Sequence, residues 1–109
     1  MPDPRRHPRY PVSLAVDLIS EAGLQQCQAE DLSAGGCRVV TVFPIPRGSA
    51  VRIRLRSPAV AFEIGAPATV AWSTREPPYR AGLQFAEASV PEAGRFLQAL
   101  LGPVRLENS

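Results

Sequence analysis

The sequence predicts a mainly β fold: a six-stranded antiparallel barrel, closed or split, followed by a C-terminal α-helix. Three observations lead to this prediction. Apolar residues recur at every second position in several short segments between residues 11 and 85, which is typical of half-buried strands. Turn-forming residues separate these segments at short intervals, which favours antiparallel hairpins, and closure of such a sheet removes its exposed edges. After residue 88 the apolar period changes to that of a helix.

The first half of the chain predicts three strands. The first begins at Pro11, and a second, more polar strand follows a turn at residues 21–23. Residues 31–36 form a turn by composition, because Asp, Ser and two glycines all favour tight turns. The apolar positions on one face of the first strand are Val12, Leu14, Val16 and Leu18. The strands expected here are 11–20, 24–30 and 37–42.

The second half contains the clearest alternation in the chain. Val51, Ile53 and Leu55 point to one side of a strand, and arginines 52, 54 and 56 point to the other. We call these three arginines the arginine face; it is either a solvated sheet face or a partner surface. Residues 60–64 and 68–73 look like further strand segments around Gly65 and Pro67, and a last strand is expected at 80–85, so that the whole pattern indicates about six short strands.

The last part of the chain predicts one amphipathic helix. Ser89 and Glu92 have the spacing of a capping box, and Gly102 with Pro103 should end the helix. The residues expected on its buried face are Ala93, Phe96, Leu97, Leu100 and Leu101. The expected organisation is a flexible arginine-rich arm at residues 1–10, the barrel with its helix at 11–103, and a tail at 104–109.

Length and composition predict a single globular domain. The chain has 109 residues and a net charge of +2, which is too small to indicate general binding to DNA or RNA. No apolar run is long enough to span a bilayer, and the N-terminal residues do not resemble a signal peptide, so we expect a cytoplasmic protein. In that compartment Cys27 and Cys37 should be reduced and half-buried, although a redox link across a hairpin stays open.

The sequence does not favour an enzyme. It contains no phosphate-binding loop, dinucleotide fingerprint, zinc-protease motif or nucleophile elbow. Its acidic residues are scattered, and His7 is the only histidine. Two cysteines without a histidine cluster make no zinc site, so neither a metal nor a cofactor is expected.

The N-terminal arm carries three closely spaced arginines, Arg5, Arg6 and Arg9. Each guanidinium can make two hydrogen bonds to a phosphate or to the O6/N7 edge of guanine. Pro4 and Pro8 stiffen the segment, which lowers the entropy lost when it becomes ordered. The alternative is an unstructured basic tail.

The segment at residues 31–36 could form the opposite wall of a binding site. The side chains of Asp31 and Ser33 can bond nearby backbone amides, and a carboxylate can also accept from the N1 and N2 hydrogens of guanine. Gly35 and Gly36 allow a positive φ and the close approach of a ligand. The alternative is an ordinary hairpin turn.

Together these two segments resemble the PilZ domain family. The resemblance rests on Arg5-x-x-x-Arg9 leading into Tyr10-Pro11-Val12, and on Asp31-x-Ser33-x-x-Gly36 about one hairpin later. The later segments Val70–Ser73 and Tyr79–Phe85 also look like the final strands of the family. The resemblance covers most of the chain. It implies a six-stranded antiparallel barrel with a C-terminal helix, and a receptor for the bacterial second messenger cyclic di-GMP.

The resemblance also implies roles for individual residues. Arg5 and Arg9 would hold guanine edges and phosphates, and Asp31, Ser33 and Gly36 would form the opposing wall. Trp72 lies where some members place a ring against a guanine, and it otherwise fits a core tryptophan. Arg6 and Arg38 are further candidates for phosphate contacts. The arm would close over the ligand, and this ordering would signal to a downstream protein.

The sequence leaves three points open. Some family members have another arginine directly before the first motif arginine, where this chain has Pro4, and this favours one ligand per chain. One alternative is a degenerate adaptor that binds a protein through the arginine face and binds no nucleotide. Another is a nucleic-acid-binding barrel, which the lack of exposed aromatics beside these arginines disfavours.

Overall fold

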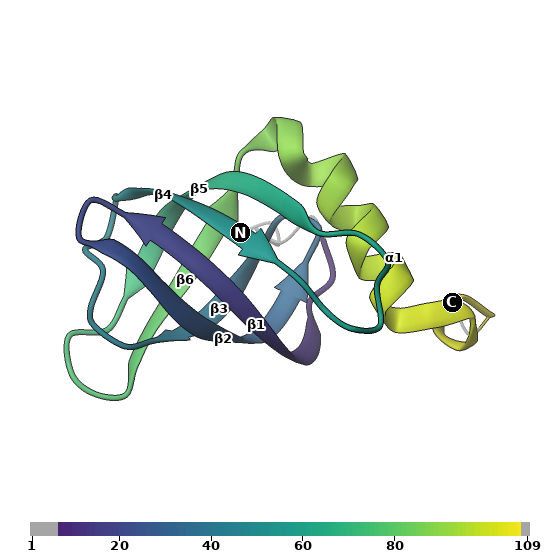
Figure 1. Cartoon of the computed structure of the whole chain (residues 1–109), viewed down its shortest axis with the longest axis horizontal. Helices are drawn as coiled ribbons and strands as arrows, with labels where there is room; N and C mark the ends of the chain where they lie inside the picture. The colour runs from purple at the N-terminus through teal and green to yellow at the C-terminus, as the bar shows by residue number, and fades with distance from the viewer. Residues whose placement is uncertain (1–6, 108–109) are drawn as a thin grey trace, which may run out of the picture.

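The structure, a computed structural model, describes residues 7–107, and the side chains of residues 7–102. Six strands in this part of the chain form a closed antiparallel barrel in the order β1-β2-β3-β6-β5-β4, with β4 paired back to β1. Helix α1 lies across one end of the barrel (Figure 1). The mainly β prediction, with six strands and a C-terminal helix, is confirmed. The elements are β1 Tyr10–Ser20, β2 Gly23–Ser33, β3 Gly36–Thr41, β4 Ala50–Leu55, β5 Ile64–Ser73, β6 Tyr79–Phe85, a 3-10 turn Glu87–Ser89 and α1 Val90–Glu107.

Alternating apolar residues of all six strands fill the barrel in the described chain. β4 shows the pattern most plainly, because Val51, Ile53 and Leu55 are buried and the arginines between them point outward. Both cysteine side chains also point inward and both are free thiols. The expectation of half-buried cysteines is therefore wrong: Cys27 and Cys37 lie in the core.

Helix α1 closes one end of this core. Ala93, Phe96 and Leu97 are buried, and Leu100 and Leu101 pack partly buried against the same cluster, which confirms the predicted apolar face. The ring of Phe62, from the loop between β4 and β5, meets the ring of Phe96 edge-on at 6.0 Å between centroids. At Gly102 the helical path breaks, with φ 76° and ψ 175°, and helical backbone resumes as far as Glu107.

Three local predictions are wrong. Residues 60–63 form no strand, because Val60 and Phe62 turn toward the core and the helix, and one long strand begins only at Ile64. The turn predicted at 31–36 is shorter, since β2 continues to Ser33 and β3 starts at Gly36. The capping box is absent: Ser89 ends a 3-10 turn directly before α1, and within the described residues its side chain makes no hydrogen bond.

Candidate functional site

Four of the predicted site residues lie on or beside one row that crosses the outside of the barrel. The strand register pairs Trp72 with Gly82, Gly82 with Arg38, Arg38 with Asp31, and Asp31 with Pro11. We call these five residues the outer row. Three strand spacings separate Trp72 from Asp31, or about 14 Å. The row ends at the start of β1, directly after Arg9.

Asp31 ties the N-terminal segment to the barrel. Its Oδ1 accepts the backbone N–H of Arg38 at 3.1 Å and lies 3.3 Å from Nη1 of Arg9. Its Oδ2 lies 3.6 Å from Nε of Arg38. The side chain of Asp31 is only 13% exposed, and these three contacts hold its carboxylate in place. The structure thus places Arg9, the second arginine of the N-terminal motif, against Asp31, the first residue of the motif at residues 31–36.

Ser33 shapes the turn from inside. Its buried hydroxyl oxygen accepts the backbone N–H groups of Gly35 and Gly36, each at 3.1 Å, and donates to the carbonyl of Gly36 at 3.3 Å. These bonds use the hydroxyl within the turn itself. Ser33 therefore sets the path of the backbone between β2 and β3.

The two glycines of the turn are closely packed, Gly36 against backbone and Gly35 against the side chain of His7. A Cβ on Gly36 would collide with the carbonyl oxygen of Leu83 in β6, and a Cβ on Gly35 would lie 2.7 Å from the ring of His7. Neither glycine has a positive φ, so the turn does not use the left-handed conformation that glycine allows. The contact of His7 with Gly35 also shows that residues 7–9 lie over this turn.

Trp72 is not a core residue. Its side chain is 39% exposed and its indole covers Gly82, leaving no room for a Cβ there. A register shift between Val70 and Trp72 turns the indole outward from the alternation of β5. The ring forms the end of the outer row farthest from the arm.

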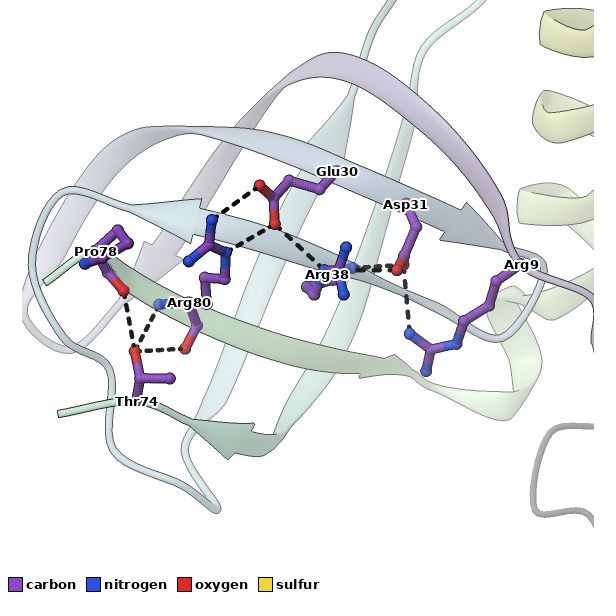
Figure 2. Close-up of polar contacts among 7 residues, drawn as sticks. All are labelled: Arg9, Glu30, Asp31, Arg38, Thr74, Pro78 and Arg80. Atoms are coloured by element: carbon purple, nitrogen blue, oxygen red, sulfur yellow. Dashed lines mark hydrogen bonds and ion pairs between the residues drawn. The ribbon is translucent and has the colours of Figure 1, made fainter. Parts of the chain in front are cut away.

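Sequence reasoning missed two residues beside this row, Glu30 and Arg80. A bulge between Ala29 and Asp31 places two consecutive acids on the same outer side of β2, contrary to simple alternation. Oε1 of Glu30 lies 3.0 Å from Nε of Arg80 and 3.2 Å from Nε of Arg38 (Figure 2). Alternation with the buried Cys27 and Ala29 places Glu30 on the outer face, but only the bulge turns Asp31 outward beside it, so no sequence signal showed that the two acids share a face.

The charges of these groups stabilise one another. Hydrogen bonding to Arg80 holds the pKa of Glu30 below its ordinary value, and the charge of Arg38 acts in the same direction. The hydrogen bond to Glu30 raises the pKa of Arg80. Glu30 and Arg80 are therefore both charged at neutral pH.

The arrangement offers the groups that a guanine nucleotide needs. Arg9 and Arg38 supply guanidinium donors for phosphate or for the O6/N7 edge, Asp31 supplies an acceptor for N1–H and N2–H, and Trp72 supplies an aromatic face. Arg5 and Arg6 lie outside the described residues. Within residues 7–107 no three acidic, cysteine or histidine side chains gather to hold a metal ion. No helix in the described chain is both long and apolar enough to cross a bilayer.

Comparison with known proteins supports the same fold. The sequence profile of the PilZ domain matches residues 3–102. The structure of the Bacillus subtilis inhibitor of motility MotI/DgrA superposes with a TM-score of 0.75 at 22% identity, covering 98% of this chain and 53% of that chain. This chain therefore spans about half the length of that protein. No curated protein sequence matches significantly.

Two further structures are isolated PilZ domains. That of CeSA from a cellulose-synthesizing bacterium has a TM-score of 0.61 at 22% identity and covers 83% of this chain and 97% of that chain. The PilZ domain of YcgR from Escherichia coli, solved with c-di-GMP, has a TM-score of 0.64 at 17% identity and covers 90% and 88%. At these identities the likeness shows the fold.

Proposed function

The chain belongs to the PilZ domain family, and from this premise we propose that it is a receptor for cyclic di-GMP. The observation that carries the proposal is the outer row, in which Trp72, Arg38 and Asp31 share one face of the barrel and Arg9 lies at its end. The PilZ domain of YcgR, solved with c-di-GMP, supports the choice of ligand.

The proposed binding mode divides the ligand between two groups of residues. Asp31 accepts from the Watson–Crick edge of one guanine, and Arg9, with Arg5 and Arg6 of the arm, binds guanine edges and phosphates. Arg38 reaches a phosphate, and Trp72 stacks on a guanine. Ser33, Gly35 and Gly36 hold the wall in shape, because the Ser33 hydroxyl binds both glycine amides and the backbone of β6 leaves no room for a Cβ at Gly36.

Closure of the arm is the proposed output. In this structure residues 7–9 already lie on the turn through the contact of His7 with Gly35 and the ion pair of Arg9 with Asp31. We propose that a bound nucleotide replaces this direct pair, so that the arm is held through the ligand. A downstream protein in the cytoplasm would then recognise the ordered arm together with the barrel.

A titration followed by fluorescence and calorimetry tests the proposal. Trp72 is the only tryptophan, so its emission reports on the row itself, and calorimetry also gives the number of ligands per chain. We expect Asp31→Ala, Arg9→Ala and Arg5→Ala each to weaken binding about 10- to 100-fold, because hydrogen bonds to charged groups contribute about 1.5–3 kcal/mol. Arg52→Ala, on the far strand β4, should bind like the wild type.

The result that would reject the proposal is a folded wild-type protein that shows neither heat nor fluorescence change with ligand at about 50 μM, well above the micromolar Kd expected of a receptor. Loss of binding in Arg52→Ala equal to that in Asp31→Ala would also reject the assigned site. One ligand per chain is the expected stoichiometry.

The alternative adaptor function depends on the arginine face being free to contact a protein. Nη2 of Arg56 lies 2.9 Å from Oδ1 of Asp17, and Nε of Arg54 lies 4.0 Å from Glu63. Two of the three arginines therefore have acidic neighbours within the chain. This favours the nucleotide receptor. Retained cellular function in Arg9→Ala, with loss of function on reversal of the three charges, would favour the adaptor.

A further inference from the structure

Glu30 and Arg80 lie beside the outer row and, together with Arg38 of that row, form a compact charged group that we call the Glu30 cluster. One carboxylate serves two guanidiniums: Oε1 of Glu30 accepts from Nε of Arg80 at 3.0 Å, and Oε2 accepts from Nη2 at 3.4 Å. The same Oε1 lies 3.2 Å from Nε of Arg38. All three side chains are partly exposed on the outer surface, where Figure 2 shows them in line with Asp31 and Arg9.

The backbone holds Arg80 at this position. Its N–H donates to Oγ1 of Thr74 at 2.8 Å, and its carbonyl accepts the backbone N–H of Thr74 at 2.9 Å. Arg80 precedes Gly82 of the outer row by two residues, so it points to the same side of β6 and lies roughly 7 Å along the strand. A ligand that covers Gly82 and Arg38 therefore comes within reach of the Arg80 guanidinium.

One donor in the cluster lacks a good acceptor. The Nε atom of Arg38 is buried, yet no well-directed hydrogen bond reaches it, although Glu30 lies close. A buried donor of a charged group without a directed partner is unfavourable. A better-directed acceptor that took the place of the Glu30 carboxylate would satisfy it.

We propose that the Glu30 cluster is a further anion subsite of the ligand site, in which Arg80 binds a phosphate and Glu30 is the internal anion that this phosphate replaces. This inference rests on the proposed function for the nature of the ligand. It assigns a role to two residues outside the two family motifs.

The exchange of anions is physically reasonable. Partly exposed ion pairs contribute little to stability, so releasing Glu30 into water costs little. A phosphate offers several acceptor oxygens and can bind a guanidinium through two parallel hydrogen bonds. Glu30 therefore lowers the affinity in two ways: it occupies Arg38 and Arg80, and its own charge repels the ligand.

A double-mutant cycle with cyclic di-GMP tests the assignment. Affinities are measured for wild type, Glu30→Gln, Arg80→Gln and the double variant, with Arg52→Gln as a matched control on β4. We expect Glu30→Gln to tighten binding about fivefold, in keeping with the loss of two weak pairs. We expect Arg80→Gln to weaken binding about tenfold or more, both with Glu30 and with Gln at position 30. Thermal unfolding confirms that each variant is folded.

The behaviour of the double variant decides between a ligand contact and a merely structural pair. If Arg80 only neutralises Glu30, Arg80→Gln will have no effect once residue 30 is Gln, and the inference is overturned. Unchanged affinity in Glu30→Gln overturns it as well. In both cases, if the wild-type protein still binds cyclic di-GMP, only the subsite is rejected and the proposed receptor function stands.

A second measurement does not depend on the nucleotide. Inorganic pyrophosphate is titrated into the wild-type protein and into Glu30→Gln, and the Nε–H resonances of Arg38 and Arg80 are followed by NMR. We expect both resonances to shift, at lower pyrophosphate concentration in Glu30→Gln. Resonances that do not respond overturn the subsite, whatever the result with cyclic di-GMP. A pyrophosphate response without nucleotide binding would reject the receptor function alone.

Discussion

Gly36 shows most directly how single residues define the site. A Cβ at this position would collide with the Leu83 carbonyl, and backbone cannot give way as a flexible side chain can. We expect Gly36→Ala to lower the free energy of unfolding by about 1–3 kcal/mol, as overpacking does. At Gly65 a Cβ would meet only the Ile53 carbonyl at 3.8 Å, so Gly65→Ala should change the free energy of unfolding by less than about 0.5 kcal/mol. Urea unfolding measures the free energy of unfolding of both variants. An equal loss of stability in the two would contradict the close packing of Gly36 against β6.

Gly82 has a different role, because its neighbour is a side chain. The Trp72 indole occupies the space that a Cβ would need. We expect Gly82→Ala to displace the indole, shift its fluorescence emission, and weaken cyclic di-GMP binding about tenfold, since base stacking is worth about 1–3 kcal/mol. The far-UV circular dichroism should stay the same. An unchanged emission spectrum would show that the indole does not lie over residue 82.

At the scale of elements, α1 depends on one aromatic side chain. Phe96 is fully buried between the helix and the open end of the barrel, whereas Phe62, its ring partner, is 41% exposed. We expect Phe96→Ala to lower the free energy of unfolding by about 3–5 kcal/mol. Phe62→Ala should cost about 1 kcal/mol, because less apolar area is buried. Urea titrations measure both, and a larger loss in Phe62→Ala would mean that the loop, and not the helix, closes the barrel.

Regular elements were predictable from the sequence because their patterns are local. The alternation of apolar and polar residues predicted β1, β4 and β6, and the 3.6-residue apolar period predicted the buried face of the helix. The strand predicted at 60–64 failed for a tertiary reason: its apolar residues cover the end of the core and do not pair with a neighbour.

The candidate site was predictable only in part. Arg9, Asp31 and Arg38 were named from the sequence, and the structure brings them together through an ion pair and a strand pairing. Glu30 was missed because its position beside Asp31 depends on a bulge, and Arg80 was missed because its position beside Glu30 depends on the pairing of distant strands. Such irregularities leave no periodic trace in a single sequence.

At the scale of the whole molecule, the closed barrel shields both thiols. Burial raises the pKa of Cys27 to about 11, with Asp17 adding to the effect, and burial raises the pKa of Cys37 to about 12. Because the thiolate is the reactive form, we expect neither cysteine to react with a disulfide reagent at pH 8 until the protein unfolds. Rapid labelling of the native protein, as judged against a urea-unfolded sample, would contradict this burial.

The same shifts give a pH dependence of stability. Each thiol has a higher pKa in the folded state than its unfolded value of about 8.5, so the unfolded chain loses its protons first as pH rises. The thiol contribution is therefore complete below about pH 8.5 and is lost between that pH and the folded values near 11 and 12. Urea midpoints at pH 7 and 10 should differ, and the difference should shrink in Cys27→Ala/Cys37→Ala. If the double variant shows the same difference between the two urea midpoints as the wild type, the pH dependence arises from groups other than the thiols.

The ladder between β1 and β4 closes the ring, and it is the shortest in the barrel, running from Val16–Leu55 to Ile19–Arg52. The ion pair of Arg56 with Asp17 lies beside this seam. If the seam opened, each of the two strands would present a row of unpaired amides and carbonyls, the template on which another chain adds a strand. The few hydrogen bonds between β1 and β4 therefore cover two strand edges that could otherwise pair with another copy of the chain.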